Sequence, residues 1–290
     1  MNSILSRRSR RACLAGALAV ASLAAAPAAQ SATVGQPVVV AGGLEFPWEV
    51  VPLPDGRILV TERPGRVRVI GAAGLRPAPA FADARANKFL GLVAHPEYAC
   101  NRLVYLYVSY GEATGNAVVR LRDDGTNLVE PATIFDGIRS DGNHDGGRIK
   151  FGPDRRLYVT TGDVHDPATP QNVDSLNGKV LRLAAPGGAG DGAAPPDNPF
   201  NAAGEARNRR FVWSYGHRHP QGIDWDAGGR MWESEHGPTG EAYFGGKRYR
   251  DEVNRIVAGG NYGWPTVMGE ETPPPGTIGP AVTSLSLIHI

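Results

Sequence analysis

Neither sign of charge is in excess in this sequence, which has 30 lysines and arginines, 29 aspartates and glutamates, and a formal net charge of +1. A nucleic-acid-binding protein usually shows a marked basic excess. The balance therefore gives no reason to expect nucleic acid as a partner, and it favours a small molecule or another protein. Cysteine is also scarce, because Cys13 and Cys100 are the only two in the chain.

Long apolar runs are absent except near the N-terminus. Four arginines within residues 7–11 precede an alanine-rich apolar stretch from Ala12 to Ala29, and small residues follow it. This is the pattern of an export signal, so we expect residues 1–31 to be removed and the mature protein to be periplasmic or secreted without a membrane span. A membrane anchor is the alternative, but an alanine-rich segment is weakly hydrophobic. The paired arginines leave a twin-arginine export route open.

Removal of this segment would change both the charge and the cysteine content. The mature chain would keep 26 basic and 29 acidic residues, a net charge of −3. It would also keep only Cys100, so no intramolecular disulfide could form even in an oxidising compartment. No motif surrounds Cys100, and we expect a small buried or edge residue there rather than a nucleophile.

Long helices are disfavoured by 38 glycines and 24 prolines, which predict many turns and an all-β protein. A recurring unit of apolar residues, a tight turn and a second strand appears four times, at residues 50–62, 92–109, 149–163 and 223–235. An alternating, half-buried type of strand follows each unit, at residues 66–70, 117–121, 178–183 and 251–256. The arginines after the turns are Arg57, Arg102, Arg156 and Arg230, and they lie 45, 54 and 74 residues apart. These spacings are close to or above the roughly 40–50 residues of a propeller blade, so we predict a β-propeller of which about four blades are visible.

Two of these units align without gaps, with Ile149 over Ile223, and in that register His144 falls on Arg218. Equivalent residues just before the inner strands of a propeller point toward one central pocket. An imidazole and a guanidinium would therefore converge there, which is the layout of an active site.

Each motif taken alone is ambiguous. His144 could be a structural histidine in a turn or a general base that works near neutral pH. The group Asp163, His165 and Asp166 could bind a metal, but such loops are more often merely capped and solvated. The segment 236–238, His-Gly-Pro, could be a plain turn or could offer backbone carbonyls to a hard cation such as calcium.

The motifs together are more specific. In unchanged order between about Leu44 and Pro265 they are GNHDGGR at 142–148, YVTTGD at 158–163, NGKVLR at 177–182, YGHRHPQG at 215–222, EHGP at 235–238 and GNYGWP at 260–265. This combination closely resembles the soluble aldose sugar dehydrogenases that depend on pyrroloquinoline quinone, the glucose/sorbosone dehydrogenase family. The resemblance implies a six-bladed β-propeller, so residues 32–284 would form a partial propeller that could be inactive by itself. Residues 285–290 look like a translated sequencing adapter.

The resemblance also assigns catalytic roles. His144 would take the proton of the sugar C1 hydroxyl while hydride passes to C5 of the quinone, which yields a lactone. Arg218 would stabilise the negative charge that develops on a quinone oxygen. The carbonyls of Gly237 and Pro238 would hold the Ca²⁺ that polarises the quinone. The electron acceptor that reoxidises the quinone is not indicated by the sequence.

Further site residues follow from the same resemblance. Asn143 and Gln171 would contact the aldose, and Glu252 and Tyr262 would hold a second calcium ion at a dimer contact, which leaves a homodimer open. His219 stands at a cofactor-binding position where the family usually has asparagine. A glutamine of the glucose enzymes corresponds to about Ala86, so a preference for glucose is not implied. Two alternatives stay open: a propeller that binds a ligand or partner without redox chemistry, and a calcium-dependent lactonase.

Overall fold

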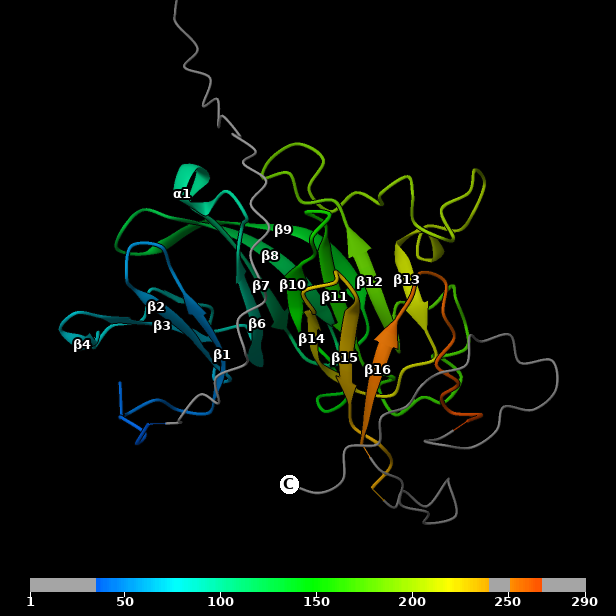
Figure 1. Cartoon of the computed structure of the whole chain (residues 1–290), viewed down its shortest axis with the longest axis horizontal. Coiled ribbons are helices and arrows are strands. Elements are labelled where there is room, and N and C mark those ends of the chain that lie inside the picture. The colour runs from blue at the N-terminus through cyan, green and yellow to red at the C-terminus, as the bar shows by residue number, and fades with distance from the viewer. Residues whose placement is uncertain (1–34, 240–250, 268–290) are drawn as a thin grey trace, which may run out of the picture. The chain divides into compact units, whose positions relative to one another are not determined.

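The computed structural model describes residues 35–239 and 251–267, and these form four antiparallel sheets that are blades of a β-propeller (Figure 1). The export signal predicted at residues 1–31 and the segment 285–290 lie outside the described residues. The first sheet contains β1 (Pro47–Pro52), β2 (Ile58–Glu62), β3 (Arg66–Gly71), β4 (Gly74–Leu75) and β5 (Phe81–Ala82). The second contains β6 (Lys88–Ala94), β7 (Leu103–Ser109), β8 (Asn116–Asp123) and β9 (Leu128–Ile138).

The third and fourth sheets carry the motifs of interest. The third contains β10 (Ile149–Phe151), β11 (Leu157–Thr161), β12 (Lys179–Leu183) and β13 (Val212–Tyr215), and the fourth contains β14 (Pro220–Trp225), β15 (Met231–Glu235) and β16 (Glu252–Ile256). The described residues include only two short helical turns, α1 (Tyr98–Asn101) and η1 (Arg209–Phe211). Cys100 is exposed in α1 rather than buried. No helix of the described part is long and apolar enough to cross a membrane.

The four repeated units predicted from the sequence are confirmed as the hairpins β1–β2, β6–β7, β10–β11 and β14–β15. The gapless alignment is confirmed as well. Ile149 pairs with Val159 in the third sheet, and Ile223 pairs with Glu233 in the fourth, with the same separation in both hairpins. His144 and Arg218 therefore occupy equivalent positions before β10 and β14.

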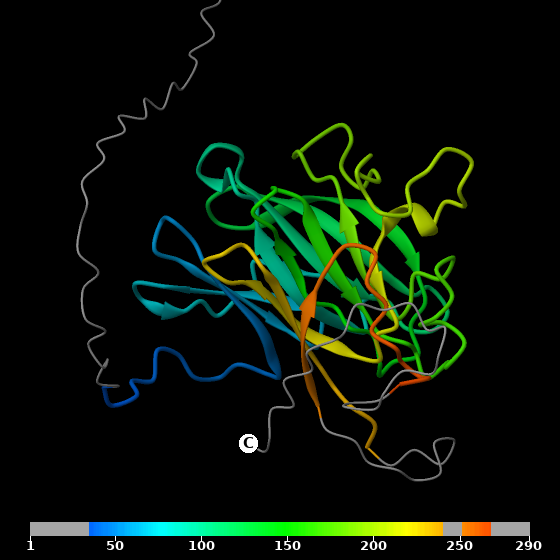
Figure 2. The same cartoon turned by 45° about the vertical axis from the view of Figure 1, so that its right-hand side comes forward.

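Apolar side chains from neighbouring sheets fill the spaces between the blades. Tyr105 and Tyr107 of the second sheet pack with Leu157 and Val159 of the third in one buried cluster. Strand β7 is buried at every position, because both of its faces are covered. Strands β1, β6, β10 and β14 contact one another in series, in the sheets that Figure 2 shows from a second side. The loops that precede β10 and β14 meet, because the ring of His144 stacks on that of His219.

Candidate active site

His144 and Arg218 meet through Asp163, which follows β11. The Nδ1 atom of His144 lies 2.7 Å from Oδ1 of Asp163. The backbone N–H of Asp163 donates to the carbonyl oxygen of Arg218 at 2.8 Å. His144 is 5% exposed and Arg218 2%, so the predicted base and the predicted cation belong to one buried site.

Asp163 fixes the protonation pattern of the imidazole. Its Oδ1 also accepts the backbone N–H of His165 at 3.0 Å, and its Oδ2 accepts the indole N–H of Trp264 at 2.8 Å. A carboxylate that already accepts these bonds favours a proton on Nδ1 of His144. The Nε2 lone pair of His144, which has no partner among the described residues, is then available to accept a proton.

The glycines of the two motifs allow the loops to approach closely. A Cβ on Gly162 would lie 2.0 Å from the carbonyl oxygen of His144. Gly146 has φ of +67°, in the left-handed region, and a Cβ there would lie 2.7 Å from the Cα of Thr161. The loop 142–147 and the end of β11 could not come together with larger residues at these positions.

Lys88, at the start of β6, holds the same loop from the neighbouring blade. Its Nζ lies 3.0 Å from Oδ2 of Asp145 and also donates to the carbonyl oxygen of Gly142. Asn116 donates to Oδ1 of Asp145 at 3.2 Å, and the Tyr107 hydroxyl donates to the carbonyl oxygen of Asp145 at 2.9 Å. Lys88 and Asp145 are both buried. Sequence reasoning missed Lys88, because no motif surrounds it.

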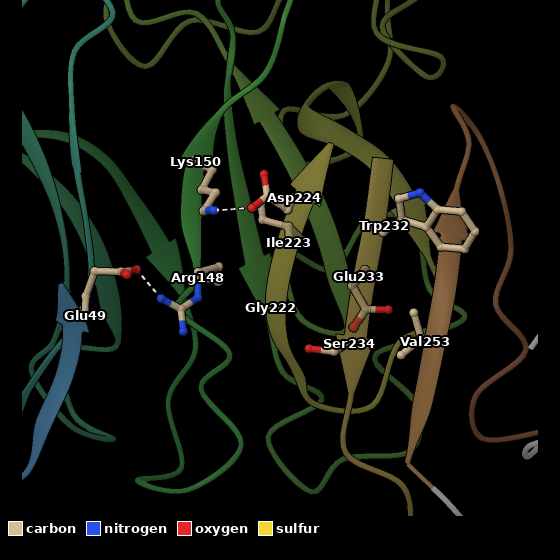
Figure 3. A pocket seen from close by; sticks show the side chains of 10 residues that line it. All are labelled: Glu49, Arg148, Lys150, Gly222, Ile223, Asp224, Trp232, Glu233, Ser234 and Val253. Carbon is tan, nitrogen blue, oxygen red and sulfur yellow. Dashed lines mark hydrogen bonds and ion pairs between the residues drawn. The ribbon is translucent and has the colours of Figure 1, made fainter. Parts of the chain in front are cut away.

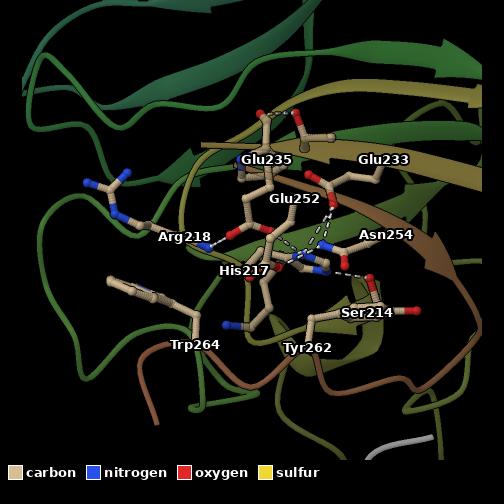
Figure 4. A network of polar contacts seen from close by, with 12 residues as sticks. Ser214, His217, Arg218, Glu233, Glu235, Glu252, Asn254, Tyr262 and Trp264 are labelled. Atoms are coloured by element: carbon tan, nitrogen blue, oxygen red, sulfur yellow. Dashed lines mark hydrogen bonds and ion pairs between the residues drawn. The ribbon is translucent and has the colours of Figure 1, made fainter. Parts of the chain in front are cut away.

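Arg218 lies at the edge of a second polar network, which surrounds His217 (Figure 4). Its guanidinium donates to the carbonyl oxygen of His236 at 3.1 Å and lies over the ring of Trp264, 5.5 Å from the centroid. Its backbone N–H donates to Glu235. His217 is fully buried, with Nδ1 at 3.1 Å from Glu235 and its ring stacked on Tyr262 at 4.7 Å. This network fixes the backbone from which Arg218 projects.

Glu233 extends this network, and it too was missed by the sequence analysis. One ligand atom from each of His217, Glu233 and Glu235 lies within 4.8 Å of the other two. Asn254 donates to Glu233 at 3.1 Å. Burial and the neighbouring Glu235 hold the pKa of Glu233 well above its usual range. His217 and Glu235 stand in the motifs at 215–222 and 235–238, whereas Glu233 stands in none of the quoted motifs.

The imidazole of the base is one of four that stack in a row. The ring of His144 stacks on that of His165 with centroids 3.7 Å apart and on that of His219 with centroids 4.7 Å apart. The ring of His219 stacks in turn on that of His236 at 5.9 Å. Burial, with the positive groups around it, lowers the pKa of His219 well below 6.5, so this ring is neutral near pH 7.

The predicted calcium ligands line one small cavity, with room for about one water-sized sphere (≈ 10 Å³). Gly237, Pro238, Glu252 and Tyr262 all face it, together with Arg218. The carbonyl oxygens of Gly237 and Pro238 accept no hydrogen bond from a described residue. The Tyr262 hydroxyl donates to the carbonyl oxygen of Arg255 at 2.7 Å, so it is bound to strand β16 of the fourth sheet.

The two predicted sugar contacts lie in different settings. Asn143 directly precedes the base, and its N–H donates to Asp141 at 2.9 Å. The side-chain amide of Gln171 exchanges hydrogen bonds of 3.0 and 2.8 Å with that of Asn261 and donates to the carbonyl oxygen of Trp264 at 2.7 Å. Gln171 therefore ties its loop to the segment that carries Trp264. Their contact with sugar stays a prediction.

A larger cavity of about 370 Å³ lies beside β14 and contains none of the predicted site residues (Figure 3). Arg148 forms an ion pair with Glu49 across it and lies over the ring of Trp48 at 4.0 Å. Lys150 pairs with Asp224 at 2.7 Å. These contacts join inner strands of different blades, and the chemistry expected of His144 and Arg218 lies elsewhere.

Comparison with known proteins gives a consistent result. The model of a family described as Glucose / Sorbosone dehydrogenase matches residues 44–283. Aldose sugar dehydrogenase YliI of Escherichia coli is 34% identical over 238 residues, which are 77% of this chain and 59% of that protein. Quinoprotein glucose dehydrogenase B of Acinetobacter calcoaceticus is 29% identical over 271 residues, 80% of this chain and 52% of that protein. The chain thus spans between about half and three fifths of these curated relatives.

Solved structures that are similar to this chain carry the same kinds of names as the sequence relatives. A putative oxidoreductase (glucose dehydrogenase) from Thermus thermophilus has a TM-score of 0.72 and 43% identity, with 81% of this chain and 69% of that chain covered. The quinone-bound aldose sugar dehydrogenase of Streptomyces coelicolor has a TM-score of 0.68 and 36% identity, with 80% and 66% covered.

Proposed function

The chain belongs to the glucose/sorbosone dehydrogenase family, and on that premise we propose that the protein oxidises the C1 hydroxyl of aldose sugars to lactones with pyrroloquinoline quinone as cofactor. The observation that carries the proposal is the His144–Asp163 pair, at 2.7 Å, joined through the backbone to Arg218. This pair supplies a base, and Arg218 supplies a fixed positive charge beside it.

The proton is handled by His144. With Nδ1–H donated to Asp163, Nε2 accepts the proton of the C1 hydroxyl, and the Asp163 carboxylate stabilises the imidazolium that forms. Because His144 is almost fully buried, water competes little for Nε2. A general base of this kind accelerates a reaction by roughly 10²- to 10⁴-fold.

The residues present fit the cofactor and its calcium ion. Pyrroloquinoline quinone, when bound, supplies the hydride acceptor that no side chain of a protein can provide. Arg218 would face it with a guanidinium held by the His236 carbonyl. Gly237 and Pro238 line the same small cavity. Their carbonyl oxygens accept no hydrogen bond within the described part of the chain, and such oxygens suit Ca²⁺. His219 would meet the cofactor with a neutral ring.

Export and assembly are part of the same proposal. The N-terminal pattern of residues 1–31 supports a periplasmic or secreted protein. Glu252 and Tyr262, which the resemblance assigns to a second calcium ion at a dimer contact, line the same cavity as Gly237 and Pro238, and that cavity has room for one ion. The four residues would therefore share one calcium ion, and the homodimer stays a prediction. A separate electron acceptor would reoxidise the quinone after each turnover.

The test is dye reduction by the full-length protein with aldoses. We expect activity only when calcium and pyrroloquinoline quinone are both added. His144→Ala should lower turnover roughly 10²- to 10⁴-fold and leave quinone affinity nearly unchanged, whereas Arg218→Ala should damage both. Equal dye reduction with a nicotinamide cofactor and no quinone would refute the proposal. Quinone binding without dye reduction by any aldose would favour the non-catalytic propeller.

A further inference from the structure

A second imidazole–carboxylate pair lies directly against the first. His165 pairs through Nδ1 with Oδ2 of Asp141, in parallel with the pair of His144 and Asp163. The His144 and His165 rings are 25° from parallel and have centroids 3.7 Å apart. The two pairs differ in exposure, because the His165 side chain is 35% exposed and that of His144 only 6%.

Asp141 connects the two histidines. Its Oδ1 accepts the backbone N–H of His144 at 3.0 Å, while its Oδ2 meets the ring of His165. Burial raises the pKa of Asp141, but the N–H of Asn143 and the His165 ring outweigh this effect and lower it below its usual value. One carboxylate thus fixes the backbone of the base and the ring that covers it.

The backbone adopts an unfavourable conformation to place the His165 ring there. Val164 has φ of +51° and His165 has φ of +50°. Left-handed geometry is uncommon for residues other than glycine and is a clear outlier for a β-branched one such as Val164. Strain of this kind persists only where the surroundings impose it, and it gathers at functional sites.

The ring of His144 is enclosed on both faces. His219 stacks on it as well, 17° from parallel and with centroids 4.7 Å apart. Two rings this close to one imidazole cannot share a face without overlapping, so His165 and His219 lie on opposite sides. With Nδ1 held by Asp163 and both faces covered, only the Nε2 edge of His144 remains for substrate.

We propose that His165 is a positioning residue for the His144 base, acting through its stacked ring, with Asp141 as its anchor. The inference rests on the proposed function and adds a residue to it. Rotation of the His144 ring about its Cβ–Cγ bond would turn Nε2 away from a bound hydroxyl, and the His165 ring opposes that rotation. A misplacement of about 1 Å can lower turnover by about 10²-fold, so the ring is needed for rate more than for binding.

Three substitutions at His165 separate stacking from hydrogen bonding. His165→Ala removes both the stacked ring and the hydrogen bond to Asp141. His165→Asn removes the ring only, because asparagine tolerates positive φ and can still pair with Asp141. His165→Phe keeps a ring that can stack. Arg139→Ala is the matched control, because Arg139 ties the same loop through an exposed ion pair with Asp166 at 2.8 Å. It leaves the His144 ring untouched.

We expect His165→Ala and His165→Asn in the full-length enzyme to lower kcat at least about tenfold while KM changes less than about twofold. His165→Phe should stay within about threefold of the parent, and Arg139→Ala should match the parent. Parental kcat in His165→Asn would overturn the proposal. So would a folded His165→Phe, judged by its melting curve, that is as impaired as His165→Ala.

A second readout is independent of turnover. In ¹⁵N-labelled protein without cofactor, the Nδ1–H signal of His144 should exchange slowly with water, and His165→Asn should broaden or abolish it while Arg139→Ala preserves it. An unchanged signal in His165→Asn would overturn the positioning role even if His165→Phe failed to fold. If His144→Ala kept parental turnover, that result would refute the proposed function itself, independently of the results for the His165 variants.

Discussion

Replacing Asp163 with asparagine tests how the candidate base is held. The carboxylate receives three hydrogen bonds: Oδ1 accepts from the His144 ring at 2.7 Å and the His165 amide at 3.0 Å, and Oδ2 accepts from the Trp264 indole at 2.8 Å. Asparagine has nearly the same shape but only one acceptor oxygen. The NH₂ group of the asparagine must therefore face at least one of the groups that donate to the carboxylate.

Either orientation of the asparagine leaves one donor without an acceptor, so the tautomer of His144 decides which way the side chain turns. If its oxygen faces His144 and His165, only the Trp264 indole loses its acceptor. If its NH₂ group faces them, the His165 amide loses its acceptor and the His144 proton must move from Nδ1 to Nε2, which blocks the base. The first orientation needs no change of the His144 tautomer, so we expect Asp163→Asn to keep the proton on Nδ1 of His144.

The magnitudes follow from that orientation. One buried donor without an acceptor costs about 1–3 kcal/mol of stability, which corresponds to a melting temperature lowered by roughly 2–12 °C. The imidazolium loses a charged hydrogen-bond partner worth about 1.5–3 kcal/mol. Since about 1.4 kcal/mol is a factor of ten in rate, kcat should fall by about 10- to 150-fold.

The assay is steady-state dye reduction by full-length protein with calcium and pyrroloquinoline quinone, next to a melting curve. Trp264→Phe is the matched control, because it removes the indole donor and leaves the carboxylate. It should change kcat far less than Asp163→Asn. A loss near 10⁴-fold would mean that the NH₂ group faces His144, and unchanged kcat would mean that His144 is not the base; either result refutes the reasoning.

Two further predictions concern pH and burial. Burial and nearby positive groups hold the folded-state pKa of His219 well below 6.5. Between the folded-state and unfolded-state pKa values, the ring is protonated in the unfolded chain and neutral in the folded one. The free energy of unfolding should therefore fall as pH drops below about 6.5. His219→Asn should reduce this slope of the unfolding free energy, by at most about 1.4 kcal/mol per pH unit; an identical slope in both proteins would contradict the assignment. Lys88→Met should cost about 3–5 kcal/mol in denaturant unfolding, since it leaves the Asp145 carboxylate buried without its cation. Arg85→Met, on an 81% exposed side chain paired with Asp83, should leave the melting temperature unchanged, and equal effects of the two substitutions would disprove the burial argument.

Local pattern was enough to predict the hairpins and one central relation of the site. Alternation within strands and turn residues between them recur in each blade, so the sequence alone aligned Ile149 with Ile223 and His144 with Arg218. That prediction is confirmed, because strand register follows from residue spacing within a hairpin. The family resemblance assigned Gly237 and Pro238 to one calcium ion and Glu252 and Tyr262 to another, whereas the structure brings all four residues to one cavity.

The support of the base could not be read from the sequence in the same way. Trp264 and Asp163 are 101 positions apart, and Lys88 and Asp145 are 57 apart. Their contacts exist because separate blades pack face to face, and no local periodicity encodes which polar side chains then meet. The stacking of His165 on His144 likewise depends on a left-handed turn at Val164 that the surrounding structure imposes. The sequence determined the hairpins and the equivalence of His144 and Arg218, and tertiary packing alone decided how these two residues are held, because hydrogen bonding and stacking depend on distances that only the close contacts between blades create.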